Sequence, residues 1–279
     1  MAKSANTVKI CDEVTLHYET IGQPSSSLPS LVFHHYYGGS PATYKHVLSQ
    51  PGLESFHKVL YHARGWSPST GAHEPGAYGI TALSSDLSTI ISETGLASQG
   101  AGYILVGHSM GGKVAQYHAA TNTSPSLKGL VLIAPAPLGG LDFPPDVKAQ
   151  QQAAYQSADG VRFALENVLT ARPGALDEGT INQCIEDSMR GNEAATAAWP
   201  DYVSSEDYGG MEEKIKVPVL VLRGDKDFER DMVGQLGAKL GWIHKMVEDC
   251  GHLIPLEKPE CVAEEILRFT ETLSWSVPQ

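Results

Sequence analysis

The sequence predicts an α/β fold in which a mostly parallel central sheet is flanked by helices. Short apolar segments alternate along the chain with segments whose apolar residues recur at helical spacing. The clearest buried-strand segment, YILV at residues 103–106, runs directly into a glycine-rich turn and then a helix. About eighty residues between two later strand segments lack a strand pattern, which predicts a helical insertion in the α/β core.

The individual elements follow from the same two periodicities. Strands are expected at residues 7–10, 14–20, 31–34, 58–62, 103–106, 127–134, 217–222 and 245–247. Amphipathic or helix-favouring segments predict helices at residues 81–93, 113–121 and 260–274. The alternation of strand and helix is typical of a sheet covered on both faces.

The long connection after residues 127–134 is too long for a plain crossover between parallel strands. Residues 145–198 within it are rich in Ala, Gln, Glu and Leu, which favour helix. We therefore expect a first part of the core at residues 1–137, a helical cap at residues 138–214, and a second part of the core at residues 215–279.

Composition narrows the possible partners of the 279-residue chain. The formal net charge of −12 would repel nucleic acid, and no basic amphipathic or long apolar segment indicates a membrane contact. The four cysteines show no metal-ligand spacing, and no apolar signal segment follows the N-terminus. These features predict a cytoplasmic protein that acts on a small molecule without a metal; they leave open a monomer or a homodimer.

A nucleophile motif stands directly after the strand segment at residues 103–106. Residues 107–111 read GHSMG, with a helix-favouring segment behind them. A tight turn between strand and helix exposes the hydroxyl of Ser109, and the flanking glycines keep side chains out of that turn. The N-terminus of the following helix stabilises negative charge beside the hydroxyl. We therefore expect Ser109 to be a nucleophile.

The chain resembles the α/β-hydrolase superfamily over nearly its whole length. Four blocks occur in the order of that family: LVFHHYYGGS at residues 31–40, ARGWS at 63–67, the elbow GHSMGG at 107–112, and GDKD at 224–227 followed by GH at 251–252. The resemblance implies an α/β-hydrolase fold, a helical cap and chemistry that requires no cofactor.

The resemblance also implies the partners of Ser109. The family order is nucleophile, acid, histidine, and His252 takes the place of the base that removes the serine proton. The acid usually stands three residues after the glycine, which selects Asp227. Asp225 in the same loop and Asp142 after the preceding strand remain alternatives.

The oxyanion of such a reaction needs two preorganised N–H donors. The resemblance assigns them to the backbones of Met110 and Tyr36. The sequence departs from the family at His35, where most members have glycine, so contact of His35 or Tyr37 with substrate and packing beneath the loop both remain open. Trp66 and Trp199 are further candidates for an apolar acyl pocket.

Some relatives open epoxides or displace halide with an aspartate nucleophile. Because Ser109 stands at the position of the nucleophile, this chain is not expected to carry out those reactions. We expect a serine hydrolase that cleaves a carboxylester, lactone or thioester of a small to medium acyl substrate through an acyl-enzyme. Two alternatives stay open. The chain could be a ligand-binding or receptor-like homologue with little turnover, or a carbon–carbon hydrolase or lyase that uses the same residues.

Overall fold

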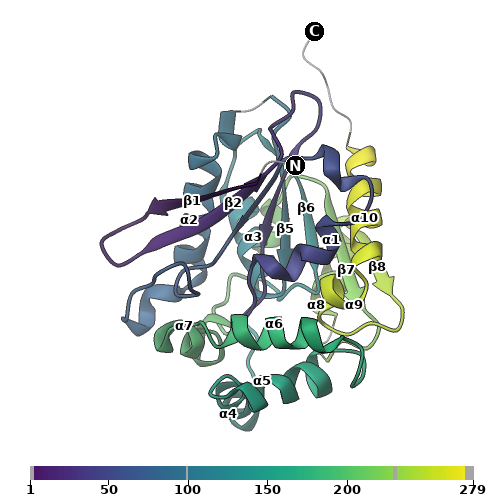
Figure 1. Ribbon diagram of the computed structural model, residues 1–279. Helices are drawn as coiled ribbons and strands as arrows, with labels where there is room; N and C mark the ends of the chain where they lie inside the picture. Colours follow the sequence, from purple (N-terminus) through teal and green to yellow (C-terminus); the bar gives the residue numbers. More distant parts are fainter. Residues whose placement is uncertain (1–2, 99, 229–230, 274–279) are drawn as a thin grey trace.

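In the part of the chain that the structure describes, eight strands form one sheet in the order β1-β2-β4-β3-β5-β6-β7-β8 (Figure 1). The computed structural model describes residues 3–98, 100–228 and 231–273. The strands are β1 Lys3–Lys9, β2 Thr15–Ile21, β3 Ser30–His34, β4 Lys58–Tyr61, β5 Tyr103–His108, β6 Leu127–Ile133, β7 Val219–Gly224 and β8 Ile243–Val247. β2 pairs antiparallel with β1 and with β4, and the remaining pairs are parallel. The predicted mostly parallel sheet is confirmed.

The helices lie on both faces of this sheet and in the insertion. They are α1 Lys45–Leu48, α2 Ile80–Glu93, α3 Met110–Thr121, α4 Pro145–Ala154, α5 Ala158–Ala164, α6 Glu178–Ser188, α7 Glu193–Ala198, α8 Met232–Leu240, α9 Ile254–Glu257 and α10 Pro259–Thr272. The helix α8 was not predicted, because Gly234 and Gly237 weaken its helical signal. A Cβ at Gly237 would lie 2.8 Å from the Trp242 ring, so close packing requires glycine there.

Alternate residues of the central strands feed two separate apolar layers. Leu105 of β5 belongs to the layer that holds side chains of α2, α3 and α8. Its neighbour Val106 belongs to the opposite layer, with side chains of α1, α9 and α10. A parallel strand covered on both faces therefore reads as a continuous apolar run, which is why residues 103–106 were recognisable in the sequence.

The helices α4, α5, α6 and α7 lie within residues 138–214, the segment expected as a helical insertion and called the insertion below, and Figure 1 shows them gathered beyond one end of the sheet. Its inner side chains pack on loops that leave the strands. Val161, Leu165 and Ile181 share an apolar cluster with Tyr36 and Leu253. The insertion thus stands over the carboxyl ends of the parallel strands, where α/β proteins place their ligands.

None of the helices within residues 3–98, 100–228 and 231–273 has the length and apolarity that crossing a bilayer demands.

Candidate active site

Ser109 stands alone between β5 and α3 in a strained backbone conformation. Its φ of 54° and ψ of −113° lie in a region that residues with a side chain rarely occupy. The end of β6 and the segment after it hold Ser109 there, because its N–H donates to the Ile133 carbonyl at 3.0 Å and its carbonyl accepts from the Ala136 N–H at 3.1 Å. The turn aims the Ser109 side chain into a cavity.

The glycines of the GHSMG motif are required by space. A Cβ at Gly107 would lie 2.5 Å from the Gly111 carbonyl oxygen. A Cβ at Gly111 would lie 2.5 Å from the His34 carbonyl oxygen and 2.7 Å from that of His35. Both contacts are with backbone, which cannot move aside cheaply, so the motif lets β5, α3 and the loop after β3 approach one another.

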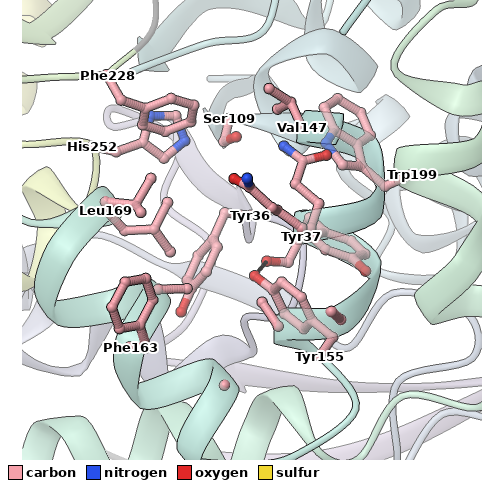
Figure 2. A pocket seen from close by; sticks show the side chains of 17 residues that line it. Tyr36, Tyr37, Ser109, Val147, Tyr155, Phe163, Leu169, Trp199, Phe228 and His252 are labelled. Carbon is pink, nitrogen blue, oxygen red and sulfur yellow. Dashed lines mark hydrogen bonds between the residues drawn. The ribbon is translucent and has the colours of Figure 1, made fainter. Parts of the chain in front are cut away.

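Asp227 is the carboxylate that reaches His252. The His252 Nδ1 atom lies 3.1 Å and 3.0 Å from the two Asp227 oxygens, and both side chains are at most 3% exposed. Arg223 Nε lies 3.2 Å from one of the same oxygens. In the tautomer that carries its proton on Nδ1, His252 donates to Asp227 and its Nε2 bears no proton. Figure 2 shows the Ser109 hydroxyl and the His252 ring facing the same cavity.

The two alternative acids lie elsewhere. Asp225 accepts from the Cys250 N–H at 3.2 Å and pairs with Lys226 at 3.1 Å. The hydrogen bond from the Cys250 N–H lowers the pKa of Asp225, and the Lys226 ammonium adds a smaller effect in the same direction. The Asp142 side chain is 95% exposed, with its oxygen 3.9 Å from the Lys148 ammonium. Neither carboxylate is placed to orient an imidazole in the cavity.

His108, the residue before Ser109, contacts His252 directly. Its Nε2 lies 2.8 Å from the His252 carbonyl oxygen, and the two rings have centroids 5.5 Å apart. Burial lowers the pKa of His108 to about 3, so the ring is neutral and donates its single proton through Nε2. Sequence reasoning did not single out His108, because its partner stands 144 positions away.

The insertion is hydrogen-bonded to residues 251–257, which contain His252 and are called the histidine loop. The Leu169 carbonyl accepts from the backbone N–H of His252 at 2.8 Å and of Leu253 at 3.2 Å. The Glu257 carboxylate accepts from Gly251 N–H at 3.0 Å and from Ala171 N–H at 2.8 Å. Four backbone donors are thereby satisfied between residues 169–171 and 251–257. This network escaped sequence reasoning, since a backbone carbonyl leaves no sequence signal.

His35 braces the loop after β3. Its Nε2 accepts from Ala63 N–H at 3.1 Å, so the proton is on Nδ1, which donates to the Tyr36 carbonyl at 2.8 Å. Burial lowers the pKa of His35 to about 3, which keeps this arrangement neutral. Among the residues that the structure describes, the backbone N–H groups of Tyr36 and Met110 have no hydrogen-bond acceptor.

A cavity of about 420 Å³ opens in front of Ser109 and His252 (Figure 2). Its walls are mostly apolar and come from the loop after β3, the insertion and the loop after β7. The lining residues are Tyr36, Tyr37, Ser109, Val147, Gln150, Gln151, Ala153, Ala154, Tyr155, Gly160, Phe163, Ala164, Val168, Leu169, Trp199, Phe228 and His252.

Two of the four candidate pocket residues line this cavity. Tyr37 and Trp199 do, but His35 and Trp66 do not, which corrects the expectation for those two. His35 points its ring nitrogens at backbone, as described above. Trp66 is 3% exposed and packs edge-on against the Tyr37 ring, with centroids 5.6 Å apart. It therefore supports the wall of the cavity from behind.

The chain is similar to esterases and to other enzymes of one fold. It is 24% identical over 263 residues to a protein phosphatase methylesterase 1 of Candida albicans. The aligned region covers 90% of this chain and 71% of that protein. An esterase from Exiguobacterium antarcticum superposes with a TM-score of 0.83 at 18% identity, covering 96% of this chain and 100% of the other. A bromoperoxidase from Bacillus anthracis gives a TM-score of 0.83 at 16% identity, with the same coverage.

The model of the alpha/beta hydrolase family matches residues 31–265, which include every block from the loop after β3 to the histidine loop. With this match and the fold described above, the chain belongs to the alpha/beta hydrolase family and is a hydrolase of that type.

Proposed function

We propose that Ser109, His252 and Asp227 form the catalytic triad of a serine hydrolase that cleaves an ester-like bond. The observation that carries the proposal is the contact of Asp227 with His252 Nδ1 beside a cavity that Ser109 also lines. Both Asp227 and His252 are buried, so their interaction is poorly screened by water. Asp227 would stabilise the imidazolium that forms when His252 accepts a proton.

The reaction follows from these positions. His252 Nε2 removes the Ser109 proton as Oγ attacks the substrate carbonyl, and the electron pair of the carbonyl moves onto its oxygen. When the tetrahedral intermediate collapses, the bond to the leaving group breaks, His252 returns the proton to the departing oxygen (or to the sulfur of a thioester), and an acyl-enzyme remains. A water deprotonated by His252 then attacks the acyl carbon, the bond from that carbon to Ser109 Oγ breaks, and His252 returns the proton to Ser109 as the acid leaves. Each step uses the groups of this chain and water.

The backbone N–H groups of Met110 and Tyr36 are our candidates for the oxyanion hole. Preorganised backbone donors at the point where charge develops stabilise a tetrahedral intermediate. Met110 begins α3, so the positive end of a helix dipole faces the same point. The bond from His35 Nδ1 to the Tyr36 carbonyl holds the second donor's loop in place without a glycine at position 35.

The substrate that we propose is a small-molecule carboxylester, lactone or thioester. The cavity size lies within the usual range of small-molecule sites, and its aromatic walls fit an apolar acyl or alcohol group.

Labelling with a fluorophosphonate, on wild type and Ser109→Ala in parallel, tests the triad. Such a probe forms a covalent bond with an activated serine, and mass spectrometry locates the adduct. We expect an adduct on Ser109 and none on Ser109→Ala, with Ser84→Ala as a matched control that labels normally. Folded wild type without an adduct would contradict the proposal and favour a ligand-binding role. Product formed without incorporation of labelled water would favour a lyase.

A further inference from the structure

Three exposed apolar side chains line the cavity. Among the described residues, the large apolar side chains that are more than a third exposed are Phe163, Val168, Met189, Phe228, Met232, Ile243 and Met246. Three of these line the cavity, namely Phe163 at 64%, Val168 at 41% and Phe228 at 43% exposure. We call Phe163, Val168 and Phe228 the apolar rim. Apolar surface that continues from a pocket marks a place where a ligand binds.

The apolar rim belongs to the His252 side of the cavity. The Phe228 ring lies 5.0 Å from the His252 ring, measured between centroids. Figure 2 shows Phe228, Leu169 and Phe163 following one another along this side.

The opposite side of the cavity is enclosed. Figure 2 shows Tyr37, Tyr155 and Trp199 there. Tyr37 is 7% and Trp199 5% exposed, and the Tyr37 ring packs against the Tyr155 ring with centroids 4.4 Å apart. This wall of three aromatic side chains has little room to yield, so it limits the size of the group that it holds.

The proposed reaction, on which this inference rests, decides which part of the substrate meets each side. His252 returns its proton to the oxygen of the leaving group, so that oxygen must lie beside His252. The bond from Ser109 Oγ to the acyl carbon forms, the bond from that carbon to the alcohol oxygen breaks, and the proton ends on the alcohol. The alcohol therefore departs along the apolar rim, and the acyl group stays against the enclosed wall.

We propose that the preferred substrates are esters of long or bulky apolar alcohols with an acyl group small enough for the enclosed wall. The apolar rim lines the cavity on the side of His252 and is itself exposed, so an alcohol chain that grows from the reacting oxygen passes over it on the way out of the cavity. The apolar rim gives the extending alcohol chain a surface on which to leave water.

Two ester series separate the sides of the cavity. In the first, the acyl group is acetyl and the alcohol runs from ethyl to octyl; in the second, the alcohol is methyl and the acyl group runs from acetyl to octanoyl. We expect kcat/KM to rise about two- to fourfold per methylene along the alcohol series, where about 0.8 kcal/mol per buried methylene sets the upper value. Along the acyl series we expect no such rise beyond the first few carbons.

The variant Phe163→Ser/Val168→Ser removes most of the apolar rim. We expect it to lower the ratio of kcat/KM for octyl acetate to that for butyl acetate at least fivefold. Because both esters are measured with the same protein sample, a loss of folded protein lowers both values of kcat/KM equally and leaves their ratio unchanged. Phe163→Leu, which keeps an apolar side chain, should retain most of the ratio. Met189→Ser is the matched control, because Met189 is 44% exposed but does not line the cavity, and it should leave the ratio unchanged.

Three results would overturn the inference. The octyl-to-butyl ratio could stay unchanged in the double variant, or it could change equally in Met189→Ser. The double variant could also alter the dependence of kcat/KM on acyl length instead of its dependence on alcohol length. Fluorophosphonate labelling of wild type keeps the two proposals apart. Absence of the Ser109 adduct removes the proposed function itself, whereas an adduct without preference for long alcohols removes only the role of the apolar rim.

Discussion

The backbone carbonyl of Leu169 accepts a hydrogen bond from the backbone N–H of His252 at 2.8 Å. Leu169 belongs to the insertion and lines the cavity, so one residue both shapes the pocket and holds the proposed catalytic base. Glu257 strengthens the same junction by accepting from Gly251 and from Ala171. The insertion segment 169–171 is therefore part of the support of the active site, and a movement of this segment would displace His252.

Gly251→Ala tests this junction. A Cβ at position 251 would lie 2.6 Å from the Ala171 nitrogen, so the histidine loop and the insertion must separate. We expect a loss of about 1–3 kcal/mol in the free energy of unfolding and a fall in kcat of about 10- to 100-fold. Urea unfolding and ester hydrolysis measure both. Gly76→Ala, where nothing lies within 4 Å of the added Cβ, should change neither. Normal kcat in Gly251→Ala would show that the junction does not position His252.

His108 variants test the hydrogen bond to the His252 carbonyl. Leucine at position 108 leaves that buried carbonyl without its donor, at a cost of about 1–3 kcal/mol, whereas the amide of glutamine is able to donate. We expect His108→Leu to lower kcat about tenfold or more while His108→Gln retains most of it. Steady-state kinetics of both variants with one ester gives the comparison. Equal kcat in the two variants would assign His108 a packing role alone.

The neutral His35 predicts a loss of stability in acid. Its pKa is lowered from 6.5 to about 3 by burial, so between these values the unfolded chain binds a proton that the folded protein does not. The free energy of unfolding therefore decreases as pH falls below 6.5, by about 1 kcal/mol per pH unit from this residue. In urea unfolding at pH 7 and 5, His35→Gln should lose less stability than wild type over this interval. The exposed His73→Gln should follow wild type.

The burial of Lys113 predicts how the free energy of unfolding changes at alkaline pH. It is fully buried in α3, and its ammonium donates to the carbonyls of Ser204 at 3.1 Å and Glu206 at 2.6 Å. Burial lowers its pKa from 10.5 to about 8, so between pH 8 and 10.5 the unfolded chain holds the extra proton. The free energy of unfolding should rise with pH in this window by about 1 kcal/mol per unit.

Comparison of wild type with Lys113→Met isolates that contribution, because other groups that titrate above pH 8 are common to both. Urea unfolding at pH 8 and pH 10 should give a more positive change for wild type than for Lys113→Met. Identical changes would mean that Lys113 loses its proton at the same pH in the folded and the unfolded states.

Much of the fold and the order of the site residues could be predicted from the sequence, because both rest on short-range patterns. The apolar run of β5, the GHSMG turn and the helix behind it are adjacent in the chain, and their meaning is local. Ser109 is recognisable for this reason. His252 and Asp227 were placed by their order and their distance from a glycine, which is a resemblance and not a contact.

The tertiary structure alone decided which groups touch. Asp225 and Asp227 are two positions apart, yet the turn after β7 directs one to Cys250 and the other to His252. His35 stands next to Tyr36, but its ring turns away from the cavity to bond backbone.

The contacts of His108 and Leu169 with the His252 backbone join residues more than eighty positions apart, and the packing of β5 and of the insertion against the segment that holds His252 creates them. Local patterns record which elements form. The direction of a side chain within a loop, and the partner that a backbone carbonyl finds, follow from how those elements pack.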